Sequence, residues 1–289
     1  MSGAKSVVIT GASTGIGYAA AQHLSERGWR VFAGVRKDAD ARRVAGALGE
    51  AVTPVRIDVT DMASVHKAAE VVTKALDGAA LSGLVNNAGV AVAGPLLHLP
   101  IEEMTRQLDI NVTGQLRVTQ AFAPMLGARR DHQGPAGRIV NISSVAGFSA
   151  APLVTPYSCS KFALEAFTQG LRRELMLYGI DVVAINPGPI ATPIWDKAEE
   201  LDPEQYKDTD FAPAVARILS YMLKRGRDGL APVVVAEAIH RALTDKEPKL
   251  NTVITPEPFT QWLLGVLPRR MSDKMIAGRL GLTPQALKD

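Results

Sequence analysis

The sequence predicts an α/β fold in which a doubly wound parallel sheet of about seven strands carries helices on both faces. Short β-branched apolar segments alternate along the chain with longer segments of helical periodicity, and such alternation is typical of parallel strands joined by right-handed crossovers. A glycine-rich segment separates the first predicted strand from the first predicted helix. Ligands of such sheets bind at the carboxyl ends of the strands, so we expect the functional site at that edge.

The predicted strands are short, apolar and rich in β-branched residues. We expect them near residues 6–10, 31–35, 52–57, 83–87, 137–143, 181–186 and 250–255. The intervening segments predict helices near residues 16–27, 40–48, 61–76, 101–127, 156–178 and 233–244. No Ser- or Pro-rich linker interrupts this order, so we expect one domain over residues 1–289, with a helical extension over 256–289.

Composition agrees with a single α/β domain. The chain has 289 residues, of which 47% are hydrophobic, enough for a sizeable core. The formal net charge of +3 is small for this length and argues against a nucleic-acid-binding surface. The five histidines have no metal-ligand spacing, so no metal is expected.

Cysteine usage and the start of the chain predict a cytoplasmic protein. The single cysteine, Cys159, cannot form an internal disulfide, and we expect it to be a small packing residue rather than a redox centre. The first residues lack the basic stretch and long apolar core of a signal peptide. No stretch approaches the roughly 18 apolar residues of a transmembrane helix.

The glycine-rich segment has the features of an anion-binding turn. Free N–H groups and the helix dipole face an anion at a helix start, and glycines let the backbone approach a pyrophosphate closely. A tight turn without a ligand is the alternative. The spacing is G-x-x-x-G-x-G rather than the commoner G-x-G-x-x-G. We expect dinucleotide phosphates to contact Gly11, Ser13, Thr14, Gly15, Ile16 and Gly17.

Tyr157 and Lys161 stand four residues apart on a predicted helix that Thr155 can cap, with Pro156 in the first turn. Positions i and i+4 share one helix face, so a phenol would lie beside an ammonium. That charge favours the phenolate and would bring the tyrosine pKa down from about 10 toward neutral pH. Such a pair also arises by chance on amphipathic helices, so its meaning depends on the other motifs.

Seven motifs in order make residues 5–255 resemble the short-chain dehydrogenase/reductase family, in its soluble single-domain branch. They are Thr10-Gly11…Gly15-Ile16-Gly17, Asp58-Val59, Asn86-Asn87-Ala88-Gly89, Asn111, Ser143-Ser144, Tyr157…Lys161 and Pro187-Gly188 with Thr192. The resemblance implies a Rossmann-type fold and hydride transfer with NAD(P), with residues 5–188 as the cofactor-binding and catalytic core. Similarity to hydroxysteroid and retinol dehydrogenase-like members is weaker.

The resemblance also implies four catalytic residues. Tyr157 would exchange the proton, and Lys161 would hold the nicotinamide ribose and depress the tyrosine pKa. Asn111 would bend its helix and hold a water that relays protons to the lysine. Ser144 lies thirteen residues before Tyr157, which is the family spacing of the serine that polarises the carbonyl. We expect Ser143 to make a local hydrogen bond instead.

Basic residues after the second strand predict NADP(H) as the cofactor. Val35 stands where NAD-using relatives carry an acid, and Arg36 and Lys37 follow. A guanidinium matches a phosphate in a bidentate way. Two solvated basic residues are the alternative, and because the turn carries Thr14 rather than a basic residue before its second glycine, NAD(H) stays open.

The remaining cofactor contacts are implied by the resemblance. Asp58 would bind the adenine amino group, although it could also cap the following helix. The adenosine side would further use Val59, Asn87, Ala88 and Gly89. The nicotinamide side would use Pro187, Gly188, Ile190 and Thr192.

Apolar residues after the last motif predict a lipophilic alcohol or ketone as the substrate. We expect residues 189–232 to form the substrate loop, although these side chains could equally be ordinary core. The apolar residues of this segment are Ile190, Ile194, Trp195, Phe211, Leu219, Tyr221 and Met222. The sequence thus predicts an NADP(H)-dependent oxidoreductase. The alternatives are an NAD(H)-dependent dehydrogenase and a catalytically silent nucleotide-binding sensor or scaffold.

The extension over 256–289 joins apolar and basic residues. The apolar ones are Phe259, Trp262, Leu263, Leu264, Val266 and Leu267, and the basic ones are Arg269, Arg270, Lys274 and Arg279. We expect helices packed over the substrate pocket or a partner subunit, with peripheral membrane contact as the alternative. The resemblance implies a homodimer or homotetramer formed through the helices 101–127 and 156–178.

Overall fold

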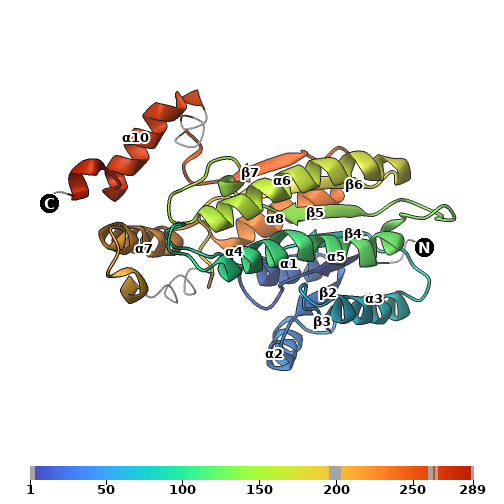
Figure 1. Ribbon diagram of the computed structural model, residues 1–289. Coiled ribbons are helices and arrows are strands. Elements are labelled where there is room, and N and C mark those ends of the chain that lie inside the picture. Colours follow the sequence, from blue (N-terminus) through green and yellow to red (C-terminus); the bar gives the residue numbers. More distant parts are fainter. Residues whose placement is uncertain (1–3, 195–202, 260–262, 264–265, 288–289) are drawn as a thin grey trace.

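The computed structural model describes residues 4–194, 203–259, 263 and 266–287. Seven parallel strands form one sheet in the order β3-β2-β1-β4-β5-β6-β7 (Figure 1). The strand order reverses between β1 and β4, which creates a crevice at their carboxyl ends. The strands are β1 (Ser6–Ile9), β2 (Arg30–Val35), β3 (Val52–Arg56), β4 (Gly83–Asn86), β5 (Arg138–Ile142), β6 (Asp181–Pro187) and β7 (Asn251–Ile254).

Helices cover both faces of the sheet (Figure 1). Those described are α1 (Gly15–Ser25), α2 (Asp38–Leu48), α3 (Met62–Leu76), α4 (Ile101–Leu108), α5 (Gly114–Phe122), α6 (Thr155–Leu175), α7 (Ala212–Arg227), α8 (Pro232–Thr244) and α10 (Arg269–Leu280). A π-helical segment (Asp109–Thr113) joins α4 to α5. Short 3-10 segments are Ala123–Leu126, Val145–Gly147, Met176–Tyr178, Pro203–Tyr206 and Pro284–Leu287.

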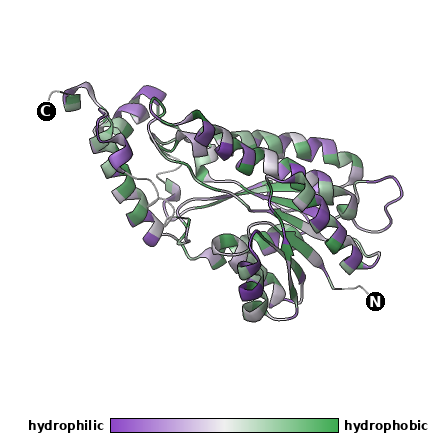
Figure 2. Cartoon of the chain, turned by 60° about the horizontal axis from the view of Figure 1, so that its bottom comes forward, coloured by the Kyte–Doolittle hydropathy of each residue, from purple (hydrophilic) through white to green (hydrophobic). Residues whose placement is uncertain are grey.

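Successive side chains along each strand point to opposite faces of the sheet, so the core has two layers. Val7 and Ile9 of β1 pack with α1 and α8 residues on one face, and Val8 packs with α3 and α5 residues on the other. All three side chains are fully buried. The apolar strands accordingly run between helices whose polar residues face outward (Figure 2).

The predicted α/β fold is confirmed, and each strand begins and ends within one residue of its expected limits. A strand buried on both faces shows as a continuous apolar run, and for that reason its ends are easy to locate in the sequence.

The helix predicted over 101–127 is wrong as a continuous α-helix. It is divided into α4, the π-helical segment, α5 and a 3-10 turn that contains Pro124. The cap predicted for α6 is also wrong, because Val154 precedes the helix and Thr155 is its first residue.

In the C-terminal third, α7 is a helix that the sequence did not predict, whereas α10 agrees with the expected helical extension. α7 falls inside the predicted loop 189–232, and α10 lies in the extension, where it projects from the rest of the molecule (Figure 1). α7 buries one face in a small cluster with Leu153 and Tyr206, against which Leu280 and Leu282 also pack. None of the described helices combines the length and apolar character that a membrane crossing requires.

Candidate active site

The switch point between β1 and β4 is braced by Thr10 and Asn87. The Thr10 hydroxyl accepts hydrogen bonds from the backbone N–H groups of Asn87 and Ala88, each at 3.0 Å. The Asn87 amide donates to the carbonyl oxygens of Thr10 at 2.9 Å and Gly11 at 3.1 Å. These bonds fix the start of the glycine-rich turn relative to the end of β4.

The glycine-rich turn has the shape of a phosphate cradle. Gly11 and Gly15 have φ angles of 65° and 59°, a region that side chains other than glycine rarely occupy. A Cβ on Gly17 would lie 2.4 Å from the Gly11 carbonyl oxygen, so only glycine fits there. Thr14 precedes α1 without capping it through its side chain, which leaves the first N–H groups of α1 free of a side-chain cap. Ser13 lies in the turn and Ile16 in the first turn of α1, so the six residues predicted to contact phosphate are close in the chain.

The segment after β6 returns to this turn. A Cβ on Gly15 would lie 3.2 Å from the Thr192 Cβ, so Thr192 stands directly over the glycine-rich turn. Ile190 is buried and pairs with Leu230, and the Gly188 N–H donates to the Ile254 carbonyl oxygen at 2.7 Å. The predicted nicotinamide contacts therefore lie beside the predicted phosphate contacts.

The carboxyl ends of β2 and β3 bring Arg36 close to Asp58. Burial raises the pKa of Asp58, but hydrogen bonds from Thr60 and the charges of Arg36 and Arg56 outweigh it and hold that pKa below its usual value. Arg36 and Lys37 are both exposed. Val59, next to Asp58, is buried. An exposed guanidinium at this edge is available to an anion.

The alternative role of Asp58 as a helix cap is wrong. Asp61 caps α3, because its carboxylate accepts from the Ala63 N–H at 2.9 Å. Asp58 instead accepts from the Thr60 N–H at 3.0 Å and the Thr60 hydroxyl at 2.7 Å. No described residue donates a hydrogen bond to its second carboxylate oxygen, which leaves that oxygen for another donor.

Ser144, Tyr157 and Lys161 meet where β5 ends against the first turns of α6. The Lys161 ammonium lies 5.5 Å from the centre of the Tyr157 ring and donates to the Ile142 carbonyl oxygen at 2.9 Å. Ser144 hydrogen-bonds Tyr157, donates to the Pro187 carbonyl oxygen at 3.2 Å and accepts from the Ala146 N–H at 3.1 Å. A hydroxyl, a phenol and an ammonium thus lie close together at the end of β5.

The pKa of Tyr157 is raised, whereas the sequence led us to expect a lowered pKa. Burial raises it, and the hydrogen bond with Ser144 lowers it by less. Burial also lowers the pKa of Lys161 to about 8, against the raising effect of Glu165. At neutral pH the phenol is therefore protonated and the lysine mostly charged, a state suited to donating a proton.

Asn111 lies in the π-helical segment and is fully buried. Its side chain accepts from the Val90 N–H at 2.9 Å and donates to the Val90 carbonyl oxygen and the Ser160 hydroxyl, each at 3.0 Å. The expected bend of the helix at Asn111 is present as the π-helical turn. Gly89 leaves room for this side chain, because a Cβ there would lie 3.2 Å from the Asn111 Oδ1.

Two residues that support Asn111 were missed in the sequence. Gln107 is fully buried, accepts from the Val92 N–H at 2.7 Å and donates to the Val90 carbonyl oxygen at 2.9 Å. Ser160 accepts from Asn111 and donates to the Tyr157 carbonyl oxygen at 2.7 Å. The spacing of four between Gln107 and Asn111 on one helix was the available signal.

Arg43 was also missed. Its guanidinium donates to the Ser13 carbonyl oxygen at 2.7 Å and to Asp40 at 2.8 Å, which ties α2 to the glycine-rich turn. Only the folded chain brings α2 over that turn.

Two smaller predictions are wrong. The Ser143 hydroxyl is buried at the end of β5 and makes no hydrogen bond to the residues that the structure describes. Cys159 is exposed on α6 rather than packed in the core. The predicted substrate residue Trp195 and the extension residues Trp262 and Leu264 lie outside the described residues.

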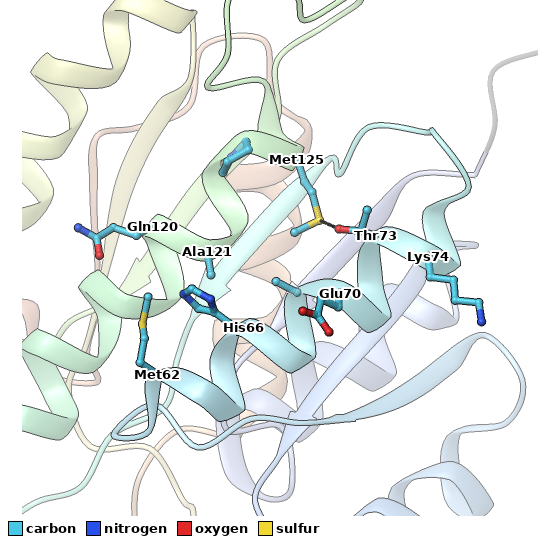
Figure 3. Close-up of a pocket in the computed structure, with 10 residues that line it drawn as sticks. Met62, His66, Glu70, Thr73, Lys74, Gln120, Ala121 and Met125 are labelled. Carbon is cyan, nitrogen blue, oxygen red and sulfur yellow. Dashed lines mark hydrogen bonds between the residues drawn. The ribbon is translucent and has the colours of Figure 1, made fainter.

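A separate groove of about 590 Å³ lies between α3 and α5 (Figure 3). It is lined by Met62, His66, Ala69, Glu70, Thr73, Lys74, Gln120, Ala121, Pro124 and Met125. No predicted site residue contributes to it, so it is not part of the candidate active site.

The residues at the switch point fit a nicotinamide dinucleotide. The turn excludes a side chain at Gly17 and offers helix N–H groups to a pyrophosphate, and Thr192 reaches the same turn. Over the described ranges, no group of three or more His, Cys, Asp or Glu residues could hold a metal ion.

Comparisons with known proteins show similarity to dehydrogenases and reductases. A family model described as short chain dehydrogenase matches residues 5–202. The NADPH-dependent 3-dehydrocapnine reductase of Ornithobacterium rhinotracheale is 39% identical over 269 residues, which cover 93% of this chain and 94% of that protein. The mitochondrial D-beta-hydroxybutyrate dehydrogenase of Bos taurus is 32% identical over 283 residues, covering 90% and 79%.

Solved structures share the fold. A short-chain dehydrogenase from Streptomyces avermitilis matches with a TM-score of 0.75 at 24% identity, covering 98% of both chains. An actinorhodin polyketide ketoreductase with NADPH matches with a TM-score of 0.73 at 27% identity, covering 91% of this chain and 98% of that one.

Proposed function

The chain belongs to the short-chain dehydrogenase/reductase family, whose members act on CH–OH groups with NAD(P), and we propose that it is an NADP(H)-dependent oxidoreductase that interconverts a hydrophobic alcohol and its ketone or aldehyde. The observation that carries this proposal is the meeting of Ser144, Tyr157 and Lys161 between the end of β5 and the start of α6. We propose these three with Asn111 as the catalytic residues.

The mechanism follows from what each side chain can do. Bound nicotinamide supplies or accepts the hydride. Ser144 and Tyr157 would hydrogen-bond the substrate oxygen from two sides and stabilise negative charge on it. Tyr157 is protonated at neutral pH because burial raises its pKa, so it would give its proton to that oxygen in the reduction. Lys161 would hold the nicotinamide ribose, and Asn111 would support a water that returns protons to the lysine.

Cofactor preference is supported by the edge formed by β2 and β3. Arg36 is exposed there, close enough for its charge to act on Asp58, and Val35 places no acid next to it. A 2′-phosphate would be paired by Arg36, whereas an acid at that point would repel it. The name of the relative from Ornithobacterium rhinotracheale as an NADPH-dependent reductase supports the same preference. Lys37, Val59, Asn87, Ala88, Gly89 and Pro187 complete the proposed cofactor set.

A lipophilic substrate is supported by the apolar surroundings of the catalytic residues. Leu153, which precedes α6, and Ile190, which follows β6, are buried, and α7 adds apolar residues within the proposed substrate segment 189–232. We propose that this segment binds the substrate and that residues 256–289 cover it.

We further propose a cytoplasmic homo-oligomer. A chain with one cysteine forms no internal disulfide and gains no stability from an oxidising compartment. The outer faces of α4 and α6 expose Ile101 and Phe162, and the turn after α6 exposes Leu177. Such apolar faces suit an isologous interface between copies of this chain.

The proposal is tested by NADPH turnover over a panel of hydrophobic ketones, comparing the wild-type enzyme with Tyr157→Phe. We expect the phenylalanine variant to lose at least about 10²-fold in kcat/KM with nucleotide affinity nearly unchanged, because the ring stays and the proton donor goes. Tyr178→Phe, which removes a phenol just beyond α6, is the control and should keep full activity. Near-normal turnover by Tyr157→Phe would remove that residue from its role, and nucleotide binding without turnover on any ketone would favour the sensor function.

A further inference from the structure

Glu165 lies one turn beyond Lys161 on α6, on the helix face that also carries Tyr157. Two asparagines hold its carboxylate. The Asn186 amide donates to one oxygen at 2.5 Å, and the Asn251 amide donates to the other at 3.3 Å. These partners come from the end of β6 and the start of β7, so two neighbouring strands hold the carboxylate in place.

The Glu165 carboxylate supplies a negative charge near the buried ammonium of Lys161. Lys161 is only 6% exposed, and a buried ammonium is unstable without an opposing charge. Its ammonium donates to the Ile142 carbonyl oxygen rather than to Glu165, so the carboxylate acts through space. Tyr157 and Glu165 are the titratable side chains that the described part of the chain brings against Lys161, and Glu165 raises the pKa of Lys161 against the effect of burial.

The same side chain touches both segments that hold Ser144. Gly147 follows Ser144 in the 3-10 turn, and a Cβ on Gly147 would lie 3.1 Å from the Glu165 Cγ. Asn186 precedes Pro187, whose carbonyl oxygen accepts the Ser144 hydroxyl. Glu165 thus connects the lysine, the serine turn and the end of β6.

We propose that Glu165 is a positioning residue for the reaction, whose clamped carboxylate keeps Lys161 charged and fixes the spacing between Lys161 and Ser144. It touches no reacting atom and acts through these two residues. The inference rests on the proposed function, because the charge of Lys161 affects turnover only if Lys161 serves the nucleotide and Tyr157.

Glu165→Gln tests the proposal, since it removes the charge and keeps the shape. The fold should survive, because the Asn186 Oδ1 has no hydrogen-bond partner within the described ranges and can accept from the new amide. We expect the alkaline limbs of kcat/KM for ketone reduction and of NADPH affinity to move down by about one pH unit, because loss of the anion lowers the pKa of Lys161 further. Glu174→Gln is the matched control, because Glu174 is exposed on the same helix and its charge should not matter.

Glu165→Asp separates the effect of the charge on Lys161 from the effect on the spacing between Lys161 and Ser144. It keeps the charge but shortens the reach to the asparagines, so we expect an alkaline limb within about half a unit of wild type and a kcat reduced about fivefold or more. This variant also decides the matter if the glutamine variant fails to fold: an unchanged kcat would overturn the positioning role.

A folded Glu165→Gln enzyme whose pH profiles coincide with those of wild type and Glu174→Gln overturns the inference while leaving the proposed function intact. A wild-type enzyme that reduces no ketone refutes the proposed function instead, and the pH dependence of NADPH affinity then still tests Glu165.

Discussion

Gly17 in the glycine-rich turn and Gly278 in α10 stand in opposite surroundings. In the turn, Gly17 lies so close to the Gly11 carbonyl oxygen and the Asn87 amide that no side chain fits. In α10, a Cβ on Gly278 would meet nothing within 4 Å, and the helix has no buried residue. Close packing therefore excludes a side chain at Gly17, whereas Gly278 has room for one.

The two regions also attach differently to the core. The turn is held by bonds from β4 and α2 and lies over a sheet that is buried on both faces. α10 reaches the rest of the chain through Leu280 and Leu282, which pack on the α7 cluster, and through the Arg217 guanidinium, which donates to the Leu280 carbonyl oxygen at 3.1 Å. Leu153 of that cluster accepts from the Gly94 N–H through its carbonyl oxygen, so the cluster adjoins the segment between β4 and α4.

The largest effect is expected from Gly17→Ala. The added methyl would collide with backbone, so the turn must shift, and overpacking of this kind costs about 1–3 kcal/mol of the free energy of unfolding. Nucleotide affinity should fall by at least tenfold, since the phosphate cradle moves with it. Denaturant unfolding and nucleotide titration measure both. A variant with wild-type stability and affinity would show that the turn is not close-packed.

Arg36→Ala should come next. A hydrogen bond to a charged group is worth about 1.5–3 kcal/mol, so NADP(H) affinity should fall about ten- to a hundredfold, with NAD(H) affinity almost unchanged. Arg42→Ala is the control, because Arg42 is exposed on the neighbouring helix. Equal losses for both nucleotides, or a wild-type preference for NAD(H), would contradict the proposed cofactor.

A smaller effect, on the free energy of unfolding at low pH, is expected from the contact between α1 and α8. The rings of His23 and His240 lie 5.7 Å apart, and burial is the largest cause that lowers the pKa of each, followed by the charge of Arg27. The unfolded chain then binds more protons than the folded chain as the pH falls through the ordinary value of 6.5, so stability should decline below that pH.

Unfolding at pH 7.5 and pH 5.5 measures this decline, and His23→Gln should reduce it. His66→Gln is the control, because His66 is exposed on α3, away from this pair. An equal decline in wild type and His23→Gln would exclude the histidine pair as its cause.

The smallest effect is expected from Gly278→Ala in α10. Alanine in place of glycine inside a helix stabilises it by about 0.5–1 kcal/mol. Hydrogen exchange of the α10 amides should slow by about two- to fivefold, while turnover stays at the wild-type value. A loss of turnover would mean that α10 packs against the site more closely than its exposed residues indicate.

The sequence by itself determined the sheet and the order of the motifs. Strands buried on both faces must be apolar, and a phosphate turn must carry glycine, so both leave local patterns such as Val7 to Ile9 and Gly11 to Gly17. Tyr157 and Lys161 share a helix, and for that reason their contact was readable from a spacing of four.

Only the tertiary structure decided the direction of the pKa shift at Tyr157 and which contacts support the site. The pKa of Tyr157 rises because burial outweighs its hydrogen bond, and burial depends on segments far apart in the chain. The clamp on Glu165 needs β6 and β7, the contact of Arg43 with Ser13 needs α2 folded over the turn, and the burial of α7 needs Leu153 and Tyr206. Such contacts join residues with no local pattern between them, and for that physical reason they appear only once the chain has folded.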